Sequence, residues 1–303
     1  MRRFCWTGGA CRAVRLAMFA GLVAAGGAAE PEVPPAQAEP EAPEVDFIQE
    51  AVWSPAGDRL LVAWDQGGRV RLYGVHGPDT TDSAIEAGSG LPVSDGPDLG
   101  PSWSKNGLWV AFSSSRDGQG EIYRMRPDGM QVERLTDDPA EDTDPSFSPD
   151  GRTIAFVSDR TDGVPRLHLM DIDGENVRAV PNPPGERHQR PDWSPDGTRL
   201  AVQVTMEDGD YVYLANPGGG WGRVKAGTFP AWAPNGDDIY LTRNDSLLVM
   251  RTSSGSLRLL LPDGFAPRPS PDGRWVAFIR GAWPTSALYA LRLDTGLEVR
   301  LTR

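Results

Sequence analysis

Short apolar runs with a period of two recur along the chain from residue 47 to its end, and no helical periodicity follows residue 30. In each run two large apolar residues flank a position that is alanine in four of six cases, as in Ile154-Ala155-Phe156. Runs with both faces apolar are typical of strands buried between stacked sheets, and the small residue lets a neighbouring sheet approach. The pattern therefore predicts an all-β chain built from stacked sheets.

Each apolar run follows a seven-residue phrase that occurs six times, for example Pro191-Asp-Trp-Ser-Pro-Asp-Gly197. Within the phrase, proline presets φ for a tight turn and glycine accepts the positive φ that closes the turn. Five copies carry an aromatic residue, which is predicted to be the large core residue of an innermost strand, whereas the sixth has Pro269 there. The final glycines are 50, 44, 46, 39 and 37 residues apart: Gly57, Gly107, Gly151, Gly197, Gly236 and Gly273.

Each repeat has room for four strands. A third strand such as 121–125 and a fourth such as 132–136 follow the apolar run, with an Asp-Gly hairpin turn between them. Residues 47–303 hold about 43 residues per repeat, which matches the ~40–50 residues of a four-stranded propeller blade. The sequence therefore predicts that residues 45–303 form a six-bladed β-propeller of four-stranded antiparallel blades.

The repeat resembles the TolB-like propeller repeat, whose pattern is Pro-x-Trp-Ser-Pro-Asp-Gly-x-x-Ile-Ala-Phe. Residues 145–178 match it closely at Pro145, Phe147, Ser148, Pro149, Asp150, Gly151, Ile154, Ala155, Phe156, Ser158 and Arg160. The resemblance covers the propeller only, without the N-terminal domain of TolB. In prolyl-peptidase-like enzymes the same repeat precedes an α/β-hydrolase domain, and no such domain follows the sixth repeat here. The resemblance therefore favours a binding function over a hydrolase.

Two segments of different composition precede the repeats. Residues 1–29 contain four arginines and an apolar run of about ten residues, which is too short to cross a ~30 Å bilayer core, and they are typical of a signal peptide. Both cysteines, Cys5 and Cys11, fall in this segment, so the mature chain would contain none. Residues 30–44 are rich in proline and glutamate and predict an extended linker. We therefore expect a periplasmic or secreted bacterial protein.

The charge and motif content narrow the function classes. The formal net charge is -12, so binding to a nucleic-acid phosphate backbone is disfavoured. Hydrophobic residues make up 39 %, which supports a core but predicts no membrane span after signal removal. The sequence has no Gly-x-Ser-x-Gly elbow, His-Glu-x-x-His motif, phosphate loop or Cys/His metal cluster. We therefore expect no catalytic residues and no cofactor.

Strand order gathers the candidate binding residues on one face. In an antiparallel blade, the loops that enter each first strand share a face with the loops between strands two and three. These loops are long and dissimilar, as binding loops are, whereas the short turns of the opposite face are expected to be structural. The candidates on the loop-rich face are Asp142, Asp144, His188, Arg190 and Trp283. The leading hypothesis is a non-enzymatic binding or scaffold module that engages an envelope protein or peptide through this face.

Several alternatives remain open. Asp142 and Asp144 could bind an arginine of a neighbouring blade, and Arg116 and Arg160 favour interblade salt bridges, while His188 could be a solvated loop residue. A second hypothesis is a metal-assisted sugar or lactone lyase or hydrolase, in which Asp142, Asp144 and His188 hold a divalent cation in the central channel. A third is a carbohydrate-binding protein in which Trp283 stacks on a sugar.

Overall fold

The computed structural model describes residues 46–79 and 97–302, and every regular element in these ranges is a strand. The signal peptide expected at 1–29 and the linker expected at 30–44 lie outside the described residues. In the described ranges, no helix is long and apolar enough to cross a membrane.

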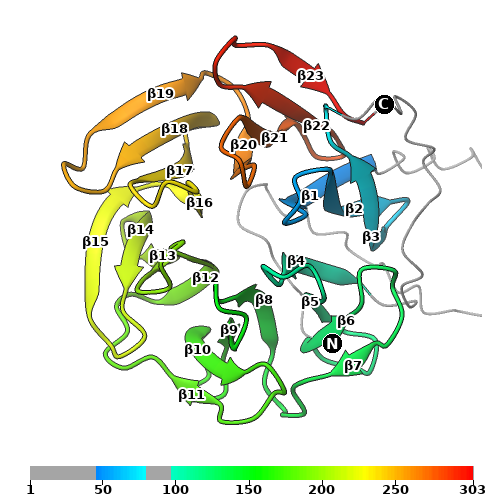
Figure 1. The fold of residues 1–303 in the computed structure, drawn as a ribbon. Coiled ribbons are helices and arrows are strands. Elements are labelled where there is room, and N and C mark those ends of the chain that lie inside the picture. Colours follow the sequence, from blue (N-terminus) through cyan, green and yellow to red (C-terminus); the bar gives the residue numbers. More distant parts are fainter. Residues whose placement is uncertain (1–45, 80–96, 303) are drawn as a thin grey trace, which may run out of the picture. The chain divides into compact units, whose positions relative to one another are not determined.

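Four separate sheets each contain four consecutive antiparallel strands (Figure 1). The first sheet contains β4 (Asp98–Trp103), β5 (Val110–Ser114), β6 (Glu121–Met125) and β7 (Glu133–Arg134). The second contains β8 (Asp142–Phe147), β9 (Thr153–Ser158), β10 (Arg166–Asp171) and β11 (Arg178–Ala179). The third contains β12 (Arg187–Trp193), β13 (Leu200–Met206), β14 (Gly209–Ala215) and β15 (Trp221–Ala226). The fourth contains β16 (Thr228–Trp232), β17 (Asp238–Arg243), β18 (Ser246–Arg251) and β19 (Leu257–Leu261).

The seven other strands form one sheet. One part of it contains β1 (Asp46–Trp53), β2 (Arg59–Gln66) and β3 (Arg69–His76). The other part contains β20 (Phe265–Pro269), β21 (Trp275–Ala282), β22 (Thr285–Arg292) and β23 (Glu298–Arg300). A single parallel pairing of Asp46 with Thr285 joins the two parts. An all-β propeller with four-stranded antiparallel blades is thus confirmed, but the predicted count of six blades is not, because the first and last repeats share a sheet.

One backbone hydrogen bond and two that involve side chains reinforce the joint between the first and last repeats. The Asp46 N–H donates to Pro284 O at 2.9 Å, and the Ile48 N–H donates to the Ser286 hydroxyl at 2.7 Å. Near the other end of β1, the Trp53 indole N–H donates to Arg268 O at 2.9 Å. The strand β1 is therefore bound to the last repeat near both of its ends.

The middle strands bury both faces, as the period-two pattern predicts. In β9, Ile154, Ala155 and Phe156 all have no exposed surface. Ala155 packs with Leu200 and other residues of the following sheet, whereas Ile154 and Phe156 pack with Ala111 of the preceding sheet. Each large side chain buried in this way stabilises the fold by about 1.5–3 kcal/mol. Each sheet is therefore stable only between two neighbours.

The first strand of each repeat, which we call the inner strand, lies nearest the centre in Figure 1 and ends in the predicted tight turn. After β8, the Gly151 N–H donates to Ser148 O at 2.9 Å, and the φ of Gly151 is 69°. The Ser148 hydroxyl donates to the Asp150 carboxylate at 2.6 Å, and this hydrogen bond lowers the pKa of Asp150. The phrase therefore specifies both the turn and its polar contacts.

A pair of glycine variants tests whether neighbouring sheets resist added volume. Gly151→Ala places a Cβ in open space, so it should cost only the positive φ, about 1–2 kcal/mol. Gly174, in the turn between β10 and β11, also has a positive φ, but its added Cβ would clash with the Leu135 carbonyl oxygen of the preceding repeat. Gly174→Ala should therefore lose about 1 kcal/mol or more beyond Gly151→Ala in denaturant unfolding. Equal losses of unfolding free energy in the two variants would show that neighbouring sheets accommodate the added methyl group without a loss of stability.

Candidate functional site

We call the aromatic residue of each phrase the anchor. A β-bulge interrupts each inner strand: it lies just before the anchor or Pro269 in five strands, and between Ile48 and Glu50 in β1. In five strands the residue before proline has a φ between 49° and 58°: Gly100, Asp144, Arg190, Phe229 and Ala266. For the four residues that carry a Cβ this conformation is sparsely populated, and such residues persist only where the surrounding structure holds them. The repeat therefore fixes a positive φ at this position, which is strained in four of these five inner strands.

Some of these positions, and some of those that follow the proline, carry charged residues. Glu50 of β1 takes the place of Asp144 in β8 and Arg190 in β12, and Asp192 and Arg268 follow a proline. We call Glu50, Asp144, Arg190, Asp192 and Arg268 the inner-strand cluster. The Arg190 N–H donates to the Asp144 carboxylate at 3.0 Å. The Arg190 guanidinium lies 4.1 Å from the centre of the Phe229 ring.

The charges of this cluster act on one another across different inner strands. Burial raises the pKa of Glu50, and the charges of Arg190 and Arg268 lower it while Asp144 raises it further. Burial also raises the pKa of Asp192, against the attraction of Arg268 and a hydrogen bond from the Trp232 N–H at 2.6 Å. The cluster therefore presents carboxylates and guanidinium groups together in a partly buried setting.

The predicted residue Asp142 is part of a structural contact. Its side chain has no exposed surface, and Arg160 donates to it at 2.6 Å while also donating to Ser158 at 2.9 Å. Asp98 and Arg116 repeat this arrangement at 3.0 Å in the preceding sheet. Both of these close pairs lie within one sheet rather than between blades, and a longer contact of 4.0 Å joins Arg160 to Asp138 of the loop between β7 and β8. The arginine folds back onto its own sheet, where it stacks on a phenylalanine ring, as Arg160 does on Phe156 at 5.3 Å.

The predicted residue His188 is also internal. It has no exposed surface, which contradicts the solvated-loop interpretation. The Leu167 N–H donates to Nδ1 at 3.1 Å, and Nε2 lies 2.9 Å from Pro184 O. The ring packs 4.9 Å from that of Trp221, and burial lowers the pKa of His188 to about 4. Its two nitrogens therefore bind the preceding sheet and the loop that enters β12.

The structure does not assemble the proposed metal ligands. Across 46–79 and 97–302, no three His, Cys, Asp or Glu side chains are placed to hold a metal ion. Asp142 and His188 are occupied by the contacts above, and only Asp144 belongs to the inner-strand cluster. Trp283, in the turn between β21 and β22, is 65 % exposed. Among the described residues, no hydrogen bond or ring contact joins Trp283 to the cluster.

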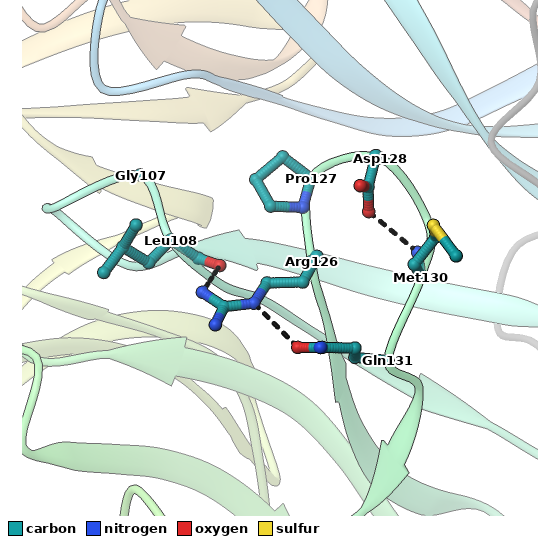
Figure 2. A pocket seen from close by; sticks show the side chains of 7 residues that line it. All are labelled: Gly107, Leu108, Arg126, Pro127, Asp128, Met130 and Gln131. Carbon is teal, nitrogen blue, oxygen red and sulfur yellow. Dashed lines mark hydrogen bonds between the residues drawn. The ribbon is translucent and has the colours of Figure 1, made fainter.

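Three cavities open on the side of the short turns, which was expected to be purely structural. Figure 2 shows one of about 410 Å³, where Leu108 and Met130 are 51 % and 64 % exposed. Its Arg126 guanidinium donates to Leu108 O at 3.2 Å and to the Gln131 side chain at 3.0 Å. A second cavity of about 490 Å³ lies between the turns at 148–150 and 195–197. The third, of about 190 Å³, lies between β16 and β20 and their turns.

Sequence reasoning missed Glu50, Asp192 and Arg268. A strict alignment of the repeats contained the signal. Glu50 aligns with Asp144 and Arg190, and Asp192 and Arg268 stand at the variable position between proline and the anchor. When the repeats are aligned, these charged residues fall at equivalent positions of the inner strand.

The buried His188 predicts a pH dependence of stability. The unfolded histidine has an ordinary pKa of 6.5, whereas the folded one has a pKa of about 4, so the folded state favours the neutral ring. This contribution to stability is complete above pH 6.5 and is lost as the pH falls towards 4, by about 3 kcal/mol in total. His188→Gln keeps an acceptor for the Leu167 N–H but removes the titration. Its unfolding free energy should therefore fall less than that of the wild type between these pH values.

The exposed His76 provides the matched control for this measurement. His76→Gln should keep the wild-type slope of unfolding free energy against pH. Because the acidic groups are common to all three proteins, their titration cancels in the comparison. Identical slopes for the wild type and His188→Gln would contradict the assignment of His188 as a buried neutral histidine.

Known proteins share the repeat and the fold. Residues 93–261 match the TolB beta propeller domain. The uncharacterized protein Atu1656 of Agrobacterium fabrum is 37% identical over 158 residues, which cover 49% of this chain and 52% of that protein. The uncharacterized peptidase YuxL of Bacillus subtilis is 30% identical over 196 residues, 59% of this chain and 28% of that protein. The matched part of the chain thus spans about half or less of these curated relatives.

Among solved structures, TolB from Acinetobacter baumannii superposes with a TM-score of 0.64 at 20% identity, covering 84% of this chain and 63% of that one. At this identity the likeness shows a shared fold alone. The family match, in contrast, rests on the repeat itself and covers more than half of the 303 residues. The chain therefore belongs to the TolB beta propeller domain family.

Proposed function

We propose that this chain is an exported, non-enzymatic binding module that holds a protein or peptide segment of the cell envelope at its inner strands. Residues 1–29 would direct export and 30–44 would link to the propeller. The predicted partner is still an envelope protein or peptide, but the proposed site is the inner-strand cluster, because Asp142 and His188 are occupied by internal contacts. Asp144 and Arg190 are the predicted residues that remain in the site.

The observation that carries the proposal is the mixed charge of the cluster. Glu50 is half-buried and interacts with Arg190, Arg268 and Asp144, which come from three other inner strands. A peptide offers charged side chains as well as backbone donors and acceptors, and both signs of charge in the cluster can pair with them. Partly buried charge pairs give specificity because a partner with the wrong charge leaves them unpaired.

We also propose that the propeller has six blades. In this interpretation, β1–β3 form one blade and β20–β23 form another, and a single parallel pairing joins the two blades into one sheet. The support is that the phrase occurs once before β2 and once before β21, as it does before β5, β9, β13 and β17. Six inner strands then surround the cluster.

Crosslinked capture from a bacterial envelope extract tests the binding function. The bait is the full chain, compared with a Glu50→Gln/Asp144→Asn double variant. Each amide keeps an acceptor for the backbone N–H that the carboxylate binds, at Gly100 and Arg190, but removes the negative charge. One partner should be enriched by the wild type and reduced about tenfold or more by the double variant, since tenfold corresponds to about 1.4 kcal/mol.

The control bait carries Asp128→Asn, an exposed turn residue whose amide can still accept from the Met130 N–H. This bait should capture the partner as well as the wild type does. Equal capture by all three baits would place the partner elsewhere on the surface, and the cluster would not be the site. No enrichment by any bait would overturn the proposed binding function.

A further inference from the structure

Of the six inner strands, β20 alone has no aromatic residue at the anchor position. In the anchors of the first and fourth repeats, the indole N–H donates to the backbone O of the residue after proline in the preceding inner strand. These bonds join Trp53 to Arg268 at 2.9 Å and Trp193 to Ser146 at 3.2 Å. At the same position β20 has Pro269, and the carbonyl that an anchor there would reach belongs to Ala231. The junction between β16 and β20 therefore has no anchor side chain.

A second contact is absent from the same junction. The anchor N–H of Phe147 donates to the Ser102 hydroxyl at 3.0 Å, and that of Trp232 donates to Asp192 at 2.6 Å. Proline has no N–H, and Ala231 has no acceptor side chain. Val52 also lacks an acceptor at the equivalent position, so the change that sets this junction apart is the proline at 269. An aromatic anchor at 269 would fill the space that Pro269 leaves in this junction.

The space is a real cavity of about 190 Å³. Its apolar wall consists of two buried indoles and the prolines of the inner strand and turns: Trp53, Trp232, Pro234, Pro269 and Pro271. The Trp232 indole N–H is buried and has no hydrogen-bond partner in the part of the chain that the structure describes. In another protein, an apolar cavity of about 150 Å³ binds benzene, so one aromatic ring fits a space of this size.

The polar wall of the cavity carries both signs of charge. Asp192 and Arg268 both line it. One Asp192 oxygen accepts from Trp232, which leaves the other oxygen for a further donor. The Arg268 guanidinium donates to Pro230 O at 3.2 Å, and guanidinium has five N–H donors. A ligand that complements this wall has a ring, an anionic group and a cationic group.

We propose that this cavity binds a free aromatic amino acid as its zwitterion. The ring takes the space of the missing anchor beside Trp232 and Pro269, the carboxylate binds Arg268, and the ammonium group binds Asp192. The two opposite charges select a zwitterion over a simple aromatic acid or amine, because either of these leaves one wall charge without a partner. This inference does not rest on the envelope partner proposed above.

Calorimetric titration of the full chain with L-phenylalanine tests the proposal. The wild type should bind L-phenylalanine, and phenethylamine, which lacks the carboxylate, and L-alanine, which lacks the ring, should bind at least tenfold more weakly. Pro269→Trp supplies the missing anchor, so it should abolish binding. Arg268→Gln should weaken binding about tenfold or more, whereas Arg274→Gln, an exposed residue of the neighbouring turn, should leave it unchanged.

Circular dichroism melting identifies whether Pro269→Trp is folded, and Arg268→Gln keeps the test decisive if it is not. No heat of binding to the wild type at ligand concentrations up to about 10 mM would overturn the proposal. Equal binding of phenethylamine and L-phenylalanine would overturn it as well, as would wild-type affinity in folded Pro269→Trp. None of these results depends on whether an envelope partner is captured.

Discussion

The structure depends on one constraint: each small sheet has two apolar faces and can bury them only against two neighbours. In β9, Ala155 faces one neighbour while Ile154 and Phe156 face the other, and none of them is exposed. A row of such sheets would leave an apolar face at each end. The pairing of Asp46 with Thr285 and the hydrogen bond from Ile48 to Ser286 bring the two end repeats together and remove those ends.

The phrase before each tight turn serves packing and polar contacts at once. Its aromatic residue fills the junction between sheets, and its serine and final glycine close the turn. The residue before proline and the residue after it neither fill the junction between sheets nor close the turn. They vary freely among the repeats, and it is there that Glu50, Asp144, Arg190, Asp192 and Arg268 occur. Repetition therefore holds a fixed frame around positions that can acquire binding chemistry.

Two groups of buried charge must be distinguished. The pairs Asp98–Arg116 and Asp142–Arg160 each lie within one sheet and connect the start of the inner strand to the next loop. Removing one partner would leave an uncompensated buried charge, so these pairs are structural. The inner-strand cluster instead draws its members from different sheets. Its charges influence one another across the centre, where a ligand could reach several of them together.

The sequence by itself determined the strands, the tight turns and the family, because period-two burial and the turn chemistry of the phrase are local properties. It also indicated that Pro269 breaks the pattern of anchors. Only the tertiary structure decided that the first and last repeats share a sheet, that Asp142 and His188 are internal, and that Glu50 lies within the influence of Arg190 and Arg268. These facts depend on contacts between residues far apart in the chain, and the repeat spacing does not encode how strand ends and side chains meet across sheets.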